Sequence, residues 1–238
     1  EYSGTIPAQA NGTRVIYFIE AEDSAGRAER YPRDILGRSH PPVVNPASAS
    51  ATEELYNIYR HDTRNPSTNH HNYRFVMHEE HENELRSRRV LSNKMLDGSF
   101  IFGGDDIYYG SRIRFAGSPW GRPGGSGFDK SFSVKIPKDE PLHGRKTAFN
   151  LEDHSTDGKE RLAHYLMRRN AGSTRLPYFD FQSLVRFQLN DVRTGTYEAL
   201  DKPNRQYMNF WFPESDGPSG AHYEMDDRFS FNDSGART

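Results

Sequence analysis

The stretch IYYGSRIRFAGSPWGRPGGSGFDKSFSVKI, residues 107–136, carries the strongest information about the fold. Its two ends, 107–115 and 131–136, are rich in β-branched and aromatic side chains, which favours strands. The segment between them contains five glycines, at positions 117, 121, 124, 125 and 127. We therefore predict a β-hairpin with a long glycine-rich loop.

This loop has the composition of a phosphate-binding loop. Glycine lacks a Cβ, so successive backbone N–H groups can turn toward an anion. Lys130, where the second strand is expected to begin, can add a point charge to a phosphate. The GxxxxGK[ST] pattern of a Walker A motif is absent. Taken alone, the stretch fits an ordinary exposed hairpin loop better than a nucleotide site.

Composition indicates a globular chain with long polar loops. Hydrophobic residues make up 34% of the 238 positions, but 13% of positions are aromatic, and aromatic side chains bury a large area each. The formal net charge of -2 gives no global field that would recruit nucleic acid. No apolar run approaches the ~20 residues of a membrane span. Thiol nucleophiles and disulfides are excluded because the chain has no cysteine.

The chain divides into three parts. Residues 1–32 contain a strand at 14–20 and a turn at 24–27, and they resemble the last strands of a bacterial immunoglobulin-like or fibronectin-like module. Residues 33–72 form a proline-containing linker, in which Leu55, Ile58 and Tyr59 indicate a short helix. Residues 73–238 form the main domain, in which a weak apolar pattern also suggests a helix at 79–90.

Strand patterns dominate the main domain. Further strands are expected at 99–102, 147–151, 178–189 and 196–200. The clearest helix is predicted at 157–170, where Asp157 and Glu160 resemble a capping box and Gly172 follows as a stop. The order of hairpin, strand, helix, long strand and hairpin is that of a kinase-like amino-terminal lobe. We expect an α+β fold, a mainly antiparallel sheet with one packed helix, preceded by a short β-rich remnant.

Five segments resemble one family, the CotH spore-coat kinase family and its relatives in large exported bacterial proteins. Arg114, Gly117 and Ser118 are similar to its RGxS element, displaced by one residue, and Lys130 begins a KS pair. The other three segments are GKERLAHYLMRRNAG at 158–172, LNDVRTGTY at 189–197 and HYEMDDRFSFND at 222–233. They occur in the family's order and span a little over half of the chain.

The resemblance implies an atypical protein kinase that uses ATP and Mg²⁺. It makes Lys130 the residue that pairs with the nucleotide phosphates and Glu160 the ion-pair partner of that lysine. The glycine-rich loop would cover the phosphates, which gives a cofactor-binding set of Arg114, Gly117, Ser118, Gly124, Gly125, Ser126 and Lys130. Its partners would be proteins of an exported or surface assembly, which places the chain outside the cell or in the periplasm.

The sequence also departs from the family pattern. The resemblance implies that the catalytic aspartates lie in a carboxy-terminal lobe beyond the DDRFSFND segment, and this sequence stops at Thr238. Trp120, Pro119 and Pro123 within the loop suit packing or recognition as well as they suit phosphate binding. We expect either that the protein is longer than this sequence or that it lacks the catalytic lobe, which the sequence does not contain.

Two hypotheses of function stay open. The first is an exported CotH-like kinase represented by its amino lobe. The second is a non-catalytic adhesion, scaffold or assembly subunit. A carbohydrate-binding domain with tryptophan platforms has no spacing pattern to support it. Histidines and glutamates at 78–82 could offer metal ligands, but their HEEH spacing is not that of the HExxH zinc motif, and solvated histidines explain them better.

Overall fold

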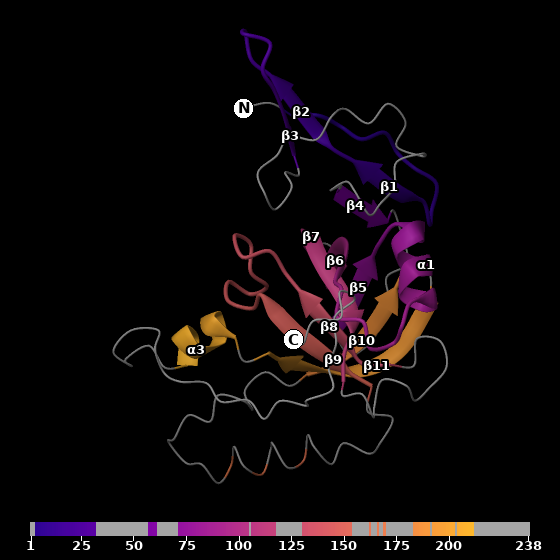
Figure 1. Ribbon diagram of the computed structural model, residues 1–238, viewed down its shortest axis with the longest axis vertical. Helices are drawn as coiled ribbons and strands as arrows, with labels where there is room; N and C mark the ends of the chain where they lie inside the picture. Colours follow the sequence, from indigo (N-terminus) through magenta and orange to yellow (C-terminus); the bar gives the residue numbers. More distant parts are fainter. Residues whose placement is uncertain are drawn as a thin grey trace.

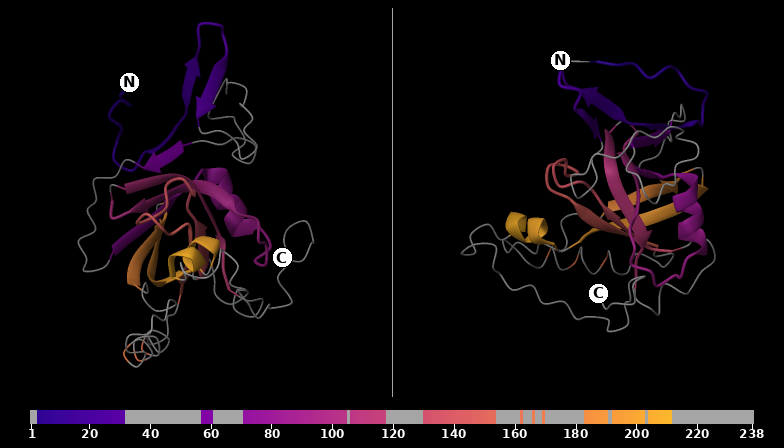
Figure 2. Two further views of the ribbon diagram at one scale, coloured as in Figure 1. Left: turned by 90° about the vertical axis from the view of Figure 1, so that its left-hand side faces the viewer. Right: turned by 45° about the horizontal axis from the view of Figure 1, so that its top comes forward.

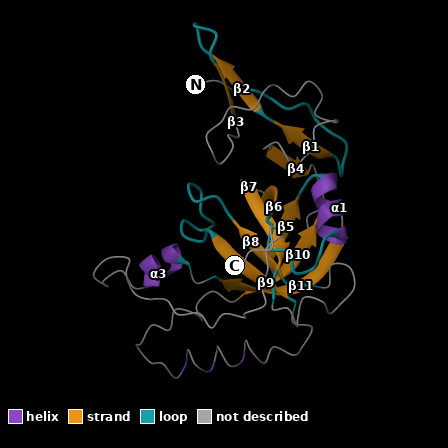
Figure 3. Cartoon of the chain, in the orientation of Figure 1, coloured by secondary structure: helices purple, strands orange, loops and turns teal. Residues whose placement is uncertain are grey.

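The computed structural model describes residues 3–31, 57–60, 71–104, 106–117, 130–153, 183–190, 192–202 and 204–211, together with Leu162, Leu166 and Arg169. Strands dominate this part of the chain (Figure 3). The helices with defined bounds among the described residues are α1 (Glu79–Ser87) and α3 (Arg205–Trp211).

Seven strands close into a barrel (Figure 1). Around the barrel, each strand is hydrogen-bonded to the next in the order β5 (His71–Val76), β6 (Leu96–Phe102), β7 (Asp106–Phe115), β8 (Phe132–Lys135), β9 (Ala148–Glu152), β11 (Val192–Asp201) and β10 (Ser183–Leu189). The first five follow one another as antiparallel neighbours. β11 then pairs with β9, and β10 returns to β5.

The closing contact between β10 and β5 is parallel. Its register runs from Val185 opposite His71 to Leu189 opposite Phe75. A ring with an odd number of strands cannot alternate direction at every step, so seven strands require at least one parallel pair. Parallel neighbours need a long connection rather than a tight turn, and the chain between β5 and β10 contains β6, β7, β8 and β9. The closure is therefore a contact between segments that are distant in sequence.

Aromatic side chains fill the barrel interior. Successive residues of a strand face opposite sides, so every second residue faces inward. The inward rings contact one another, with centroid distances of 5.1 Å for Tyr73–Phe100, 5.2 Å for Phe100–Phe149 and 5.1 Å for Phe132–Phe187. These rings are at most 3% exposed. The interior is a packed core, as expected for a barrel of few strands.

Gly98 in β6 allows this strand to lie close against β5. A Cβ at position 98 would lie 2.5 Å from both Phe75 Cε1 and the backbone oxygen of Val76. The pairing of β6 with β7 shifts register between Gly98 and Phe100, which marks a bulge. Glycine at a bulge with a close backbone neighbour is the expected use of this residue in a strand.

Helix α1 packs against the barrel through two buried residues that lie about one helical turn apart. Leu85 belongs to the main core and His81 is buried, with its Nδ1 3.1 Å from the backbone oxygen of Asp97. The helix begins after His78, whose Nδ1 accepts a hydrogen bond from the backbone N–H of Glu80 at 3.2 Å. Only an unprotonated ring nitrogen can accept this bond. Burial, the largest cause, lowers the pKa of His78, which keeps the cap in its accepting form near neutral pH.

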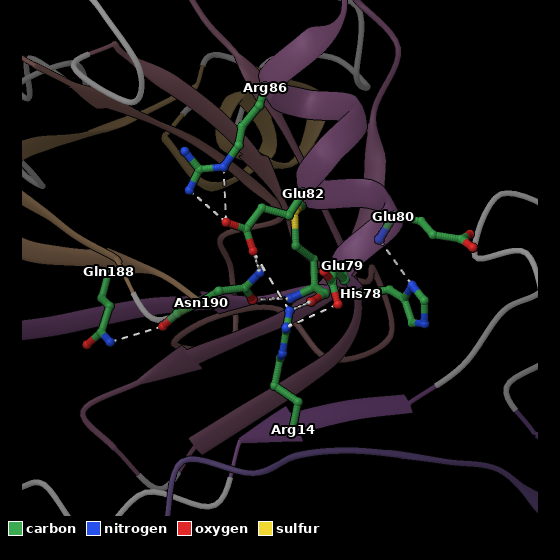
Figure 4. Close-up of polar contacts among 9 residues, drawn as sticks. Arg14, His78, Glu79, Glu80, Glu82, Arg86, Gln188 and Asn190 are labelled. Carbon is green, nitrogen blue, oxygen red and sulfur yellow. Dashed lines mark hydrogen bonds and ion pairs between the residues drawn. The ribbon is translucent and has the colours of Figure 1, made fainter. Parts of the chain in front are cut away.

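Asn190 joins the barrel closure to α1 (Figure 4). Its Oδ1 accepts a hydrogen bond from the backbone N–H of Met77 at 2.8 Å, and its Nδ2 donates to the Glu82 carboxylate. Its own N–H donates to the backbone oxygen of Phe75 at 2.9 Å. Asn190 is 3% exposed and has a φ of 47°, a conformation that asparagine tolerates better than most residues.

Two arginines extend this network from opposite sides of Glu82 (Figure 4). Arg86, one helical turn later, donates to Glu82 Oε1 from Nε and Nη2, at 3.1 and 2.7 Å. Arg14 lies 3.8 Å from Glu82 Oε2 and donates to the backbone oxygen of Met77 at 3.4 Å. The buried amide of Asn190 is thus connected through one carboxylate to the N-terminal part of the chain.

Two small ribbons precede the barrel in the chain. β1 (Arg14–Tyr17) pairs with β4 (Asn57–Arg60), and β2 (Ile19–Glu22) pairs with β3 (Ala28–Tyr31). The first ribbon contacts the barrel, since Ile16 packs against Val76 and Ile101. The second projects away from the barrel (Figure 2), and all of β2 is exposed.

The structure confirms most of the predicted strands and the helix at 79–90. The turn expected at 24–27 connects β2 and β3, because the Asp23 carboxylate accepts from the N–H groups of Ala25 and Arg27. The short helix expected to carry Ile58 and Tyr59 is wrong, because residues 57–60 form β4. The predicted helix at 157–170 lies outside the described residues except for Leu162, Leu166 and Arg169, which are helical.

The predicted fold class is wrong. We expected an α+β lobe with a mainly antiparallel sheet and one packed helix, whereas the strands close into a barrel that includes a parallel pair. Alternation of polar and apolar residues reveals which side of a strand is buried, but it carries no information about whether the sheet's two edge strands meet. Among the described positions of the expected packing helix, Leu162 and Leu166 are 56% and 48% exposed.

Replacing Asn190 tests its role in the closure. Asn190→Ala removes the bonds to Met77 and Glu82 and places alanine at positive φ, so we expect the free energy of unfolding to fall by about 2–4 kcal/mol. Asn190→Gly loses the same side chain, but glycine adopts positive φ without strain. Its free energy of unfolding should therefore fall by about 1 kcal/mol less than that of Asn190→Ala. Urea unfolding measures both.

Asn83→Ala, at an exposed position of α1, is the matched control and should change stability by less than about 0.5 kcal/mol. If both Asn190 variants unfold at the wild-type urea concentration, the side chain does not secure the closure.

Candidate functional site

The β7–β8 hairpin contains the predicted nucleotide-binding residues that the structure describes. Phe115 of β7 pairs with Phe132 of β8, and beyond them the N–H of Ala116 donates to the backbone oxygen of Ser131 at 2.8 Å. Continuing this register places Gly117 across from Lys130, at the base of the glycine-rich loop. Ser118, Gly124, Gly125, Ser126 and Glu160 lie outside the described residues.

Lys130 is held against the aromatic core. The residue is 8% exposed, and its Nζ lies 6.0 Å from the centroid of the Phe115 ring. An ammonium at this distance from a ring face is attracted by the ring quadrupole. Charge is also less screened at such a site than in open solvent, which strengthens any attraction between Lys130 and an anion. The position combines a cation with a low-dielectric wall.

Gly117 has a backbone conformation that other residues rarely adopt. Its φ is 96°, and it follows directly after Ala116, whose N–H donates to the backbone oxygen of Ser131. A side chain at this φ would be strained, so glycine is required where the chain leaves β7 for the loop. The sequence predicted a glycine-rich loop here without singling out the conformation of Gly117.

Arg114 belongs to the same hairpin but to its other face. It is in register with Ser133, whereas the neighbouring Phe115 faces the core. Its Nη1 donates to the backbone oxygen of Phe115 at 2.7 Å. The structure therefore brings Arg114, Gly117 and Lys130 to one hairpin, but it does not direct Arg114 and Lys130 to the same side of the sheet.

A hydrogen bond connects β9 to the start of β8. The N–H of Asp153 donates to Ser131 Oγ at 3.1 Å, immediately beside Lys130. The chain that leads on to Glu160 therefore starts next to the candidate site. Whether Glu160 approaches Lys130 stays a prediction, because Glu160 is outside the described part of the structure.

A second charged pair lies at the other end of the barrel, and sequence reasoning missed it. Lys146 Nζ is 2.6 Å from Asp201 Oδ1, and both side chains are 9% exposed. Burial lowers the pKa of Lys146 and raises the pKa of Asp201, while each charge partly offsets the effect of burial on the other. No local motif indicates this pair, because its members are far apart in the chain: Lys146 precedes β9 and Asp201 ends β11.

The turn before Lys146 brings it to this position. His143 and Gly144 both have positive φ, 55° and 71°, and Leu142 and Lys146 exchange backbone hydrogen bonds across the turn. The His143 ring contacts Phe102 edge-on at 4.8 Å. Burial lowers the pKa of His143, and the neighbouring cations Lys146 and Arg145 lower it further.

The described ranges contain neither a cluster of metal ligands nor a helix that could span a membrane. No group of three or more His, Asp or Glu side chains there is arranged to hold a metal ion. The predicted Mg²⁺ therefore has no cluster of protein ligands among these residues. No helix of the described part is long and apolar enough to cross a membrane.

Comparison with known proteins gives no match: no family model fits this sequence, and no curated protein is detectably similar to it. The resemblance to the CotH family therefore stays a prediction from short motifs.

The buried pair of Lys146 and Asp201 makes a prediction for stability. Lys146→Met leaves the Asp201 carboxylate buried without its counter-ion, so we expect a loss of about 3–5 kcal/mol at pH 7. The double variant Lys146→Met/Asp201→Asn has no buried charge here and should recover most of that loss. Urea unfolding of the single and double variants measures this coupling.

The pH dependence of the free energy of unfolding is a second, independent test of the buried pair. With its folded-state pKa raised, Asp201 in Lys146→Met takes up a proton more readily in the folded chain than in the unfolded chain. The difference in the free energy of unfolding between wild type and Lys146→Met should therefore shrink as the pH falls from 7 toward 4. The coupling of the buried pair would be contradicted if this difference stayed constant with pH. It would also be contradicted if the double variant were as unstable as the single one.

Proposed function

We propose that this chain binds the phosphate groups of a nucleotide at the base of the β7–β8 hairpin. The observation that carries the proposal is the position of Lys130. The residue is 8% exposed, its Nζ lies 6.0 Å from the centroid of the Phe115 ring, and it is across from Gly117, where the glycine-rich loop begins. The proposal rests on this site and not on the fold, because one fold can serve many functions.

The residues have distinct roles in this proposal. Lys130 would donate to non-bridging phosphate oxygens, and Gly117 would let the backbone turn toward them. Mg²⁺ would enter with the phosphates, which commonly supply part of its coordination. Arg114 has no direct part in binding, since it lies on the other face of the hairpin.

The biological setting is part of the same proposal. We propose ATP as the nucleotide and phosphoryl transfer to exported or surface proteins as the process, as the CotH-like motifs imply. In such reactions the protein contributes mainly positioning and charge neutralisation. Lys130 suits that role because its side chain is buried beside the Phe115 ring at the base of the loop.

A titration of ATP with Mg²⁺ tests the proposal. Lys130→Met keeps the buried aliphatic stem against Phe115 and removes only the charge. We expect its affinity for ATP to fall about tenfold or more relative to wild type, as for the loss of a charged hydrogen bond. Isothermal titration calorimetry on the intact protein gives both affinities.

Lys135→Met is the matched control, because Lys135 is an exposed lysine on the same hairpin. It should bind ATP as wild type does. Absence of ATP binding by the wild type, or equal affinities of wild type and a folded Lys130→Met, would remove nucleotide binding from this hairpin. Thermal unfolding of each variant establishes that it is folded.

The second candidate is a non-catalytic scaffold or adhesion subunit. The β2–β3 hairpin favours it, because this ribbon extends from the barrel (Figure 2) and carries Ile19, 56% exposed. A two-stranded ribbon is at best marginally stable by itself and can be completed by strands of another protein. The ATP titration separates the two candidates, since a pure scaffold has no need of nucleotide.

A further inference from the structure

The first turn of α1 is where Arg14 of the N-terminal ribbon meets the barrel (Figure 4). Arg14 lies 4.0 Å from Glu79 Oε2 and 3.8 Å from Glu82 Oε2. Its Nη1 also donates to the backbone oxygen of Met77 at 3.4 Å. Met77 and Glu79 are the chain neighbours of His78, the N-cap residue of α1. The polar contacts of Arg14 therefore lie beside the residue that begins this helix.

The N-cap of α1 is a side chain that titrates near neutral pH. The preferred N-cap residues, such as serine and asparagine, accept with an oxygen that stays an acceptor across this range. His78 instead accepts from the N–H of Glu80 with its ring Nδ1, at 3.2 Å. A proton on Nδ1 turns this acceptor into a donor, so the imidazolium form cannot make the bond. The helix dipole also disfavours a cation at the N-terminal end. Protonation of His78 therefore removes the cap and adds an unfavourable charge.

Charged groups from two elements act on His78. Helix α1 contributes the carboxylates of Glu79 and Glu80 and the ring of His81, and β1 contributes the Arg14 guanidinium. Burial is the largest cause of the lowered pKa of His78, and His81 and Arg14 lower it further, whereas both carboxylates raise it. The interaction is reciprocal, because a protonated His78 disfavours the nearby Arg14 as much as Arg14 disfavours the proton.

We propose that His78 is a pH-sensitive switch for the attachment of the N-terminal ribbon to the barrel. The neutral ring caps α1 and fixes the first turn, from which Glu79 and Glu82 face Arg14. Protonation uncaps this turn and repels Arg14, so the polar part of the attachment weakens. The apolar contact of Ile16 with the barrel does not titrate and remains. The switch is independent of nucleotide binding at the β7–β8 hairpin.

The direction of the switch follows from the lowered pKa of His78. The folded chain binds the His78 proton less tightly than the unfolded chain does. The contribution of the neutral cap to stability is therefore present above a pH of about 6.5, the ordinary histidine value, and is lost as the pH falls through the folded-state pKa. Acidification, and not alkaline pH, loosens the ribbon.

Hydrogen exchange of the intact protein at pH 7.5 and 5.0 tests the switch. The exchange rate of the first turn of α1, divided by that of β9 in the same sample, corrects for the direct effect of pH on exchange chemistry. We expect this ratio to rise about fivefold in wild type on acidification, as for the loss of one N-cap. The ratio for β1, which carries Arg14, should rise with it.

Three variants separate the switch from other effects of pH. His78→Asn keeps an acceptor that does not titrate, so its ratio should be the same at both pH values. His78→Ala has no cap at either pH, so its ratio should be high at both. His143→Asn is the matched control, because burial also lowers the pKa of His143 and asparagine tolerates its φ of 55°. This control should respond to pH as wild type does.

An NMR titration of the His78 ring adds a readout that a merely structural cap would not move. In Arg14→Met the titration midpoint of His78 should rise toward the ordinary histidine value, because Arg14 is one of the causes that lower it. An unchanged midpoint in folded Arg14→Met, or a wild-type ratio that does not rise on acidification, would overturn the proposal. A rise that persists in folded His78→Asn would assign the pH response to another group, such as His81, and would overturn it as well.

Discussion

The parallel contact between β5 and β10 is the constraint on which the rest of the structure depends. Seven strands cannot close with antiparallel contacts alone, so the barrel requires one pair of this kind. The contact brings Asn190 beside Met77, 113 positions away in the chain. Asn190 then connects to Glu82, and Glu82 to Arg14 and Arg86. The position of α1 and the attachment of the N-terminal ribbons follow from this junction.

Closure also determines where chemistry can occur. The interior is filled by aromatic rings such as Phe100, Phe132 and Phe149, which leaves the two ends of the barrel for charged groups. Lys130 precedes β8 and lies near the end of β9, because Phe132 pairs with Leu151. Lys146 precedes β9 and lies near the end of β8, because Lys135 pairs with Ala148. The antiparallel register thus separates the two sites.

Sequence patterns predicted the strands well and the architecture poorly. The hairpin of β7 and β8 joins neighbouring segments, so adjacent apolar runs sufficed to predict it. The register that places Gly117 across from Lys130 came from the structure. The closure joins distant segments and leaves no local signal. Leu55, Ile58 and Tyr59 have helical spacing, yet residues 57–60 form a strand because pairing with β1 outweighs a weak local preference. Motif comparison could not have indicated the pairing of Lys146 with Asp201, which the register of β9 and β11 produces.

A cross-link across the closing strands tests the central claim most directly. Asn72 and Arg186 are register partners on the outer face of β5 and β10, and the chain has no other cysteine, so Asn72→Cys/Arg186→Cys can form one intramolecular disulfide only. Neighbouring strands lie within the Cα separation that a disulfide needs, about 4.4–6.8 Å. The closed barrel predicts rapid cross-linking on mild oxidation, detected by peptide mass mapping, and slow cross-linking of the displaced pair Asn72→Cys/Gln188→Cys. A folded protein in which neither pair forms a disulfide, or both form it equally fast, would contradict the closure.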